Sequence, residues 1–158
     1  MEVEEKKNEK EVERNIGNDL VYGQTVQFLH LKSKQYLTVV REIAELQKDC
    51  MRICLDLAGG SGSYFYFRPV YKMRIEGDRV RLGDQVHILS RKFNQYIHHS
   101  ALRFPSNSKF EVNLSTAAVK WKLHQYSKSV YSSTKVFLNV RIRPFIILKR
   151  PKQIINKK

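Results

Sequence analysis

The sequence has only two cysteines, Cys50 and Cys54, which lie four residues apart. No second pair of Cys or His residues lies at the spacing of a zinc site, so we expect no metal and no cofactor. No apolar run is long enough to cross a bilayer, and the charged stretch 1–14 lacks the apolar centre of a signal peptide. These absences predict a soluble intracellular protein in a reducing compartment.

The chain also lacks a recognisable catalytic set. Its histidines share no metal-ligand spacing: His30, His87, His98, His99 and His124. Ser100 and Asp84 could join a histidine in a hydrolytic set, but the Gly-x-Ser-x-Gly elbow of such enzymes is absent. Gly59-Gly-Ser-Gly62 resembles a phosphate-binding loop, yet neither Lys-Ser/Thr nor a helix follows it, which predicts a flexible loop. We therefore expect that the protein is not an enzyme.

Acidic residues are scarce in the second half of the chain. Residues 1–78 hold 12 Lys plus Arg against 13 Asp plus Glu, whereas residues 79–158 hold 17 against 2, and the net charge is +14. This asymmetry suggests an anionic partner, such as phosphate, nucleic acid, an acidic protein surface or a membrane. The simpler interpretation, a solvated basic face, carries more weight on sequence alone.

What the chain does contain is a repeat without a gap. Residues 23–39 recur as residues 83–99, and seven positions match at the same spacing. The matched pairs are Gly23 with Gly83, Val26 with Val86, Phe28 with Ile88, Leu29 with Leu89, Gln35 with Gln95, Tyr36 with Tyr96 and Leu37 with Ile97. Each copy has alternating apolar residues, a polar and basic elbow, and a second apolar stretch opened by an aromatic, which predicts strand, turn, strand.

Two further strands are predicted in each unit. Residues 51–55 correspond to 110–114, and the aromatic strand 63–71 is answered by 119–123, with Trp121 in the place of Phe65. Alternation should send Phe65 and Phe67 inward and leave Tyr64 and Tyr66 at the surface. Units of four short strands are typical of a β-trefoil, a closed barrel with a hairpin cap. Because a trefoil needs three units and two are evident, the sequence predicts an incomplete one.

The flanking segments differ from the repeats. Residues 1–18 carry mixed charge with almost no apolar face, which predicts disorder or a marginal helix. Residues 41–51 have apolar side chains near helical spacing, so we expect a short helix after the first hairpin. Residues 127–158 form a basic tail that lacks the repeat pattern although 136–148 is strongly β-prone. The tail is predicted to be either a strand on an open sheet edge or a divergent end.

The domain organisation expected from these segments has three parts. They are a charged segment at 1–18, a partial β-trefoil at 19–126 with repeats at about 21–75 and 81–126, and the tail at 127–158.

Several stretches resemble a known family. They are Val21–Val39, Met51–Asp56, Gly62–Arg74 and Glu76–Asp84, which are similar to the N-terminal suppressor domain, a β-trefoil of the MIR type, of inositol trisphosphate receptors. Ryanodine receptors are similar more distantly, and the resemblance covers about Glu11 to Tyr126. It implies a regulatory module on the cytoplasmic face of the endoplasmic reticulum, within a ligand-gated calcium-release channel, that acts through contacts between subunits and domains.

Four site residues follow from that resemblance alone. Pro69, Tyr71 and Lys72 match a loop that touches a neighbouring subunit, and Lys32 matches a basic contact to the ligand core. On the residues alone, Tyr71 could equally be a core or rim aromatic, and Lys32 a solvated turn residue. The expected partners are therefore the rest of the receptor, meaning its ligand core and a neighbouring subunit, with acidic surfaces as further partners of the basic tail.

The sequence also departs from the family. The phosphate-binding arginines and lysines of the ligand core fall beyond residue 158, so we expect no direct inositol trisphosphate site in this chain. The family's first trefoil unit should precede Glu11, which suggests a piece of a longer receptor. The alternative function is a basic module that binds anions or nucleic acid, although no nucleic-acid motif is present.

Overall fold

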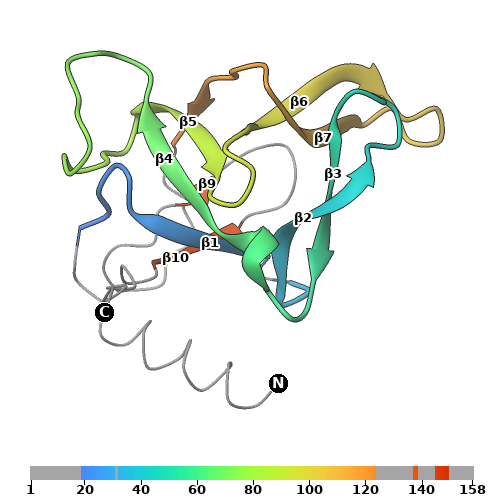
Figure 1. The fold of residues 1–158 in the computed structure, drawn as a ribbon, viewed down its shortest axis with the longest axis horizontal. Helices are drawn as coiled ribbons and strands as arrows, with labels where there is room; N and C mark the ends of the chain where they lie inside the picture. The colour runs from blue at the N-terminus through green and yellow to red at the C-terminus, as the bar shows by residue number, and fades with distance from the viewer. Residues whose placement is uncertain (1–18, 31, 124–136, 139–144, 150–158) are drawn as a thin grey trace, which may run out of the picture.

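A computed structural model describes residues 19–30, 32–123, 137–138 and 145–149. These residues form strands joined by turns (Figure 1). The elements are β1 (Thr25–His30), β2 (Gln35–Ile43), β3 (Met51–Asp56), the 3-10 turn η1 (Ser61–Ser63), β4 (Phe65–Pro69), β5 (Gln85–Ser90), β6 (Tyr96–Arg103), β7 (Phe110–Ser115), β8 (Trp121–Lys122), β9 (Phe137–Leu138) and β10 (Phe145–Lys149). The predictions for residues 1–18 and for most of the tail lie outside the described residues.

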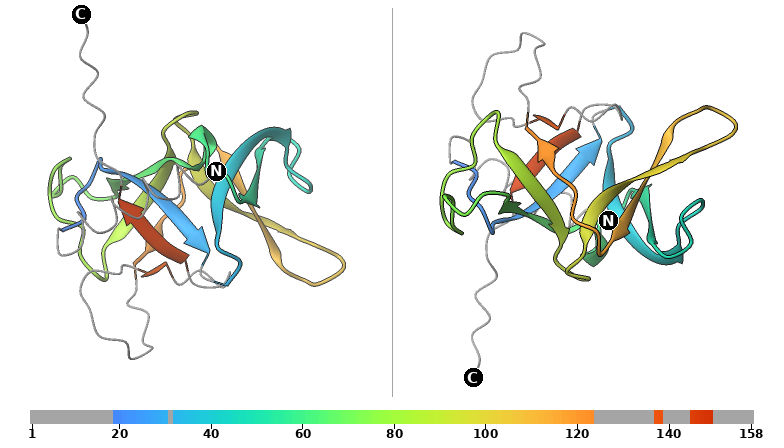
Figure 2. Two further views of the ribbon diagram at one scale, coloured as in Figure 1. Left: turned by 90° about the horizontal axis from the view of Figure 1, so that it is seen from below. Right: turned by 90° about the horizontal axis from the view of Figure 1, so that it is seen from above.

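Seven antiparallel strands close into a ring. The neighbours are β2, β3, β7, β6, β5, β4 and β1 in that order, and β1 pairs back with β2. β1 has a partner strand along each of its two edges. Val26 pairs with Phe65 of β4 and with Lys149 of β10. Leu29 pairs with Tyr36 of β2 and with Ile146 of β10. β4 and β2 therefore share one edge of β1, and β10 occupies the other, as Figure 2 shows for β10 and β1.

The prediction of an all-β fold is confirmed, whereas the predicted incomplete β-trefoil with a short helix is wrong. The prediction of an incomplete β-trefoil assumed a barrel left open by a missing unit, whereas the seven-stranded ring is closed. The tail contributes to the sheet as well: residues 145–149 form β10 along β1, in agreement with the first of the two alternatives for the tail. Closure by pairings distant in sequence cannot be read from a local repeat.

The short helix expected over residues 41–51 is also absent, and the described residues contain no α-helix. β2 continues to Ile43, and the amides of Leu46 and Gln47 each donate to the carboxylate of Glu111 on β7, at 2.9 Å. An α-helix needs those amides to bond carbonyls of its own preceding turn. The carboxylate of Glu111, which is distant in sequence, accepts their hydrogen bonds instead. No helix forms over these residues, although the apolar residues have helical spacing.

The two repeats have matching local structure. Gly23 and Gly83 have φ of 80° and 88°, and the elbow residues Lys34 and Asn94 have φ of 57° and 52°. Leu29 pairs with Tyr36 as Leu89 pairs with Tyr96. Val26 pairs with Phe65 as Val86 pairs with Trp121, which confirms the predicted match between Trp121 and Phe65.

The core lies inside the ring and is built from inward-facing residues of both repeats. Its members include Val26, Phe28, Phe65, Phe67, Val86, Ile88, Leu114, Trp121 and Leu123. Phe28 packs its ring against those of Phe65 and Phe67, with centroids 5.4 and 6.0 Å apart. The inward positions of Phe65 and Phe67 are those that the sequence predicts. The predicted exposure of Tyr66 is wrong, because the guanidiniums of Arg68 and Arg91 lie over its ring and it is buried.

Candidate functional site

The segment between β4 and β5, residues 70–84, is here named the contact loop. It extends beyond the sheet at the end of β4 (Figure 1). Four large apolar side chains in it face solvent: Tyr71 is 56% exposed, Met73 91%, Ile75 68% and Leu82 52%. Large apolar side chains that face solvent are a feature of surfaces that contact other proteins.

The contact loop is anchored to the barrel despite its exposed side chains. The buried Tyr22 donates its hydroxyl to Asp84 Oδ2 at 2.9 Å, and the Arg81 amide donates to the same oxygen at 2.9 Å. Backbone bonds of 2.9 and 3.0 Å join Tyr22 to Asp78 and to Gly77. Gly77 has φ of 95°, a conformation that glycine adopts without strain. The loop therefore presents its apolar side chains from a fixed frame.

The electrostatics at the base of the loop favour a neutral phenol. Burial raises the pKa of Tyr22 far above its ordinary value, and the hydrogen bond to Asp84 and the charge of that carboxylate raise it further. Arg74 lies 3.9 Å from the other oxygen of Asp84 and opposes this effect. Tyr22 thus remains a hydrogen-bond donor across the physiological pH range.

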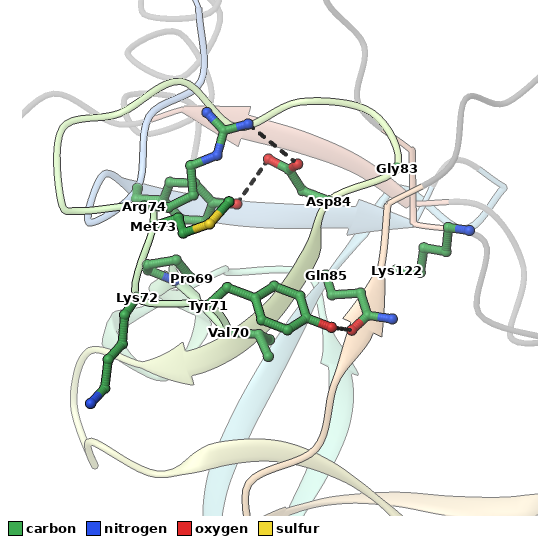
Figure 3. Close-up of a pocket in the computed structure, with 11 residues that line it drawn as sticks. Pro69, Val70, Tyr71, Lys72, Met73, Arg74, Gly83, Asp84, Gln85 and Lys122 are labelled. Atoms are coloured by element: carbon green, nitrogen blue, oxygen red, sulfur yellow. Dashed lines mark hydrogen bonds and ion pairs between the residues drawn. The ribbon is translucent and has the colours of Figure 1, made fainter.

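A pocket of about 680 Å³ opens beneath the loop. Figure 3 shows its lining: Tyr22, Pro69, Val70, Tyr71, Lys72, Met73, Arg74, Gly83, Asp84, Gln85 and Lys122. The ring of Tyr71 lies toward Gln85, and its hydroxyl donates to Gln85 Oε1 at 2.9 Å. The ammonium of Lys120 lies 5.8 Å from the centre of the Tyr71 ring. The pocket is therefore lined by both apolar and basic side chains.

The structure brings three of the four predicted site residues together. Pro69, Tyr71 and Lys72 all line the pocket, whereas Lys32 is exposed in the turn between β1 and β2 and does not line it. Sequence reasoning missed the other exposed apolar residues of the loop, at positions 73, 75 and 82. The available signal was apolar residues at irregular spacing between turn-forming Gly-Asp pairs, where no strand could bury them.

Two further kinds of feature, a cluster of metal-ligating side chains and a membrane-spanning helix, are absent from the described residues. No group of three or more His, Cys, Asp or Glu side chains there could hold a metal ion. Among those same residues, none forms a helix with the length and apolar character needed to cross a membrane.

Comparison with known proteins identifies the family. The family model described as inositol 1,4,5-trisphosphate/ryanodine receptor matches residues 1–131. The chain belongs to this family. The resemblance seen in the sequence is thereby confirmed. The inositol 1,4,5-trisphosphate receptor itr-1 of Caenorhabditis elegans is 30% identical over 133 residues, which are 78% of this chain and 5% of the nematode protein. The chain thus spans a small part of that relative's length.

Solved structures support the fold alone. The SDF2-like protein of Arabidopsis thaliana is similar with a TM-score of 0.62 at 17% identity, over 85% of this chain and 90% of that one. A Caenorhabditis elegans protein of unknown function is similar with a TM-score of 0.63 at 12% identity, over 84% and 89% of the two chains. Proteins with low sequence identity to this chain therefore share its β-fold.

Proposed function

We propose that this chain is a regulatory module of an intracellular, ligand-gated calcium-release channel. It lies on the cytoplasmic face of the endoplasmic reticulum and acts through contacts with the rest of the receptor. Membership of the receptor family supports this role. The observation that carries it is the contact loop, whose large exposed apolar side chains are held on a fixed frame.

The contact loop is the surface for a neighbouring subunit in this proposal. Tyr71 is its central residue because more than half of its side chain is exposed while its hydroxyl is held by Gln85. Aromatic residues fixed in this way give large contact area at low entropic cost, and they are frequent among the residues that dominate interface energies. Pro69 and Lys72 flank it at the pocket. Lys32, in its own turn, is proposed as a separate basic contact to the ligand core.

The test is association of the full chain with the ligand-core fragment of the nematode receptor, added as a separate molecule so that it stands for the neighbouring subunit, and measured by biolayer interferometry. We expect binding that persists when salt is raised, because apolar contacts are not screened. Tyr71→Ala should weaken it by about 2 kcal/mol, roughly 30-fold in Kd. Tyr71→Phe, which keeps the ring and loses only the bond to Gln85, should weaken it less.

The matched control is Leu102→Ala, which removes a half-exposed apolar side chain from β6 and should leave the affinity unchanged. Undiminished binding by Tyr71→Ala would contradict the assignment of the contact loop. If the chain instead bound heparin or RNA, and this binding disappeared at moderate salt while the ligand-core fragment did not bind, the anion-binding alternative would replace the regulatory role.

A further inference from the structure

Four cationic side chains, here named the basic row, come from β2, from the outer face of β4 and from the turn between β5 and β6. They are Arg41, Arg68, Arg91 and Lys92. Arg68 is half-buried and the other three are exposed. Within the described ranges, the ion pairs form elsewhere, between Arg52 and Glu42, Arg74 and Asp84, and Arg79 and Asp19. The basic row has no acidic partner among those residues.

Two aromatic rings connect the row into one surface. The guanidiniums of Arg91 and Arg68 lie 4.2 and 6.0 Å from the centre of the Tyr66 ring. The Lys92 ammonium and the Arg41 guanidinium lie 5.6 and 6.0 Å from the Phe93 ring. The alternation predicts Tyr66 at the surface, but with these cations over its ring it is only 6% exposed. Contacts of this kind favour cations over the ring face.

Neutral groups hold the two central guanidiniums in place. Arg68 donates to the hydroxyls of Tyr66 and Tyr96 at 3.3 and 3.4 Å. Arg91 donates to Thr25 Oγ1 at 3.1 Å and to the carbonyl of Gly23. A guanidinium has five N–H donors, so each retains about three for another partner. The row is oriented before binding, and its charge is not neutralised.

Cations lie over the rings of Tyr66 and Phe93, and this arrangement suits some classes of anionic partner better than others. Nucleic acid without sequence preference is held by bases stacked on free aromatic faces, and Arg91 covers that of Tyr66. A bilayer surface is bound most firmly when apolar side chains insert beside the charges, and neither Tyr66, which is buried, nor Phe93, which is half-buried, is free to do so. Carboxylates need only the fork-like donors of arginine.

We propose that the basic row is a docking surface for an acidic segment of a protein. The segment's Asp or Glu carboxylates pair with the guanidiniums of Arg68, Arg91 and Arg41 and with the Lys92 ammonium. This surface is separate from the apolar side chains of the contact loop, so it adds a second, electrostatic contact to the module.

The experiment measures binding of a fluorescent poly-glutamate peptide to the full chain by anisotropy. Arg91→Gln/Lys92→Gln should weaken binding about fivefold, since each exposed pair contributes modestly. The matched control is Arg81→Gln/Lys109→Gln, which removes the same charge from exposed positions outside the row and should change Kd less than twofold. Arg91→Lys should recover only part of the affinity, because an ammonium lacks the fork.

Each outcome decides the proposal. An equal loss in the control variant, or no loss in the row variant, overturns it. Row-dependent binding of heparin, RNA or vesicles of phosphatidylserine, without binding of poly-glutamate, also overturns it. Should loss of the bonds made by Arg91 unfold the chain, Arg41→Gln/Lys92→Gln gives the same test. Among the described residues, Arg41 makes no side-chain hydrogen bond and the Lys92 ammonium bonds only Ser61. Tyr71→Ala should bind the peptide normally, so this test is independent of the contact loop.

Discussion

Glu111 shows how one buried carboxylate can decide local structure. It lies on β7, is 5% exposed, and accepts the amides of Leu46 and Gln47 from the far side of the sequence. Burial alone would raise its pKa, but these backbone bonds and a hydrogen bond donated by the side-chain amide of Asn113 outweigh burial and hold the pKa below its ordinary value of 4.5. The turn after β2 therefore depends on a charged residue more than sixty positions away.

Glu111→Gln should lower the free energy of unfolding by about 1–2 kcal/mol at neutral pH, because an amide has one acceptor oxygen in place of two charged ones. The folded pKa lies below the unfolded one, so the stabilisation is complete above pH 4.5 and is lost as pH falls through the folded value. Urea unfolding from pH 7 to about pH 3 measures this. Wild type should lose stability in that acidic range more than the variant, and parallel curves would refute the assignment.

The stretch containing Gly59 and Gly62 is an example at the scale of one element. The sequence predicts a flexible loop, but Gly62 and Ser63 are buried in η1, and Ser63 Oγ accepts from Gln27 Nε2 at 2.6 Å. A Cβ added at Gly62 would lie 2.3 Å from the carbonyl oxygen of Val39, on β2. The glycines here permit close packing against the backbone, which composition cannot distinguish from flexibility.

Gly62→Ala should therefore destabilise the fold by about 1–3 kcal/mol, because β2 or η1 must shift to admit the methyl group. Gly60→Ala is the matched control: a Cβ there meets nothing within 4 Å, and its φ is −69°. Thermal unfolding followed by circular dichroism compares the two. Equal melting temperatures for both variants would mean that the segment around η1 can shift to admit the methyl group without loss of stability.

The contact loop illustrates the limits of prediction for the site. Its turn-forming glycines and Tyr71 were identifiable, the latter through the family resemblance. The exposure of Met73, at 91%, was not, because an apolar residue in a loop is buried or exposed according to what packs over it. Likewise, the frame that Tyr22 and Asp84 provide joins positions 62 residues apart. Such pairings depend on the closure of the ring.

At the scale of the molecule, β10 determines whether β1 has a free edge. Residues 26–30 of β1 pair with residues 145–149, while β2 and β4 occupy the opposite edge (Figure 2). An unpaired strand edge offers a template for pairing with other chains. The last strand therefore protects the first repeat, although the two are far apart in sequence.

A chain that ends at residue 144 should consequently aggregate more readily and unfold at lower denaturant than the full chain. A chain that ends at residue 149 keeps β10 and serves as the control. Light scattering and urea unfolding compare them, and hydrogen exchange should be faster at the β1 amides of the shorter chain only. If both truncated chains behaved alike, the pairing of β10 with β1 would carry no stability.

The sequence by itself determined the all-β class, the repeat, the inward positions of Phe65 and Phe67 and the family, because each is written in residues close together or in motifs copied whole. Only the tertiary structure decided ring closure, the missing helix, the exposed face of the contact loop and the aromatic-lined basic row. These depend on which distant groups meet, as Glu111 meets Leu46 or Arg91 meets Tyr66. Hydrogen-bond satisfaction and packing between such groups outweigh local preference.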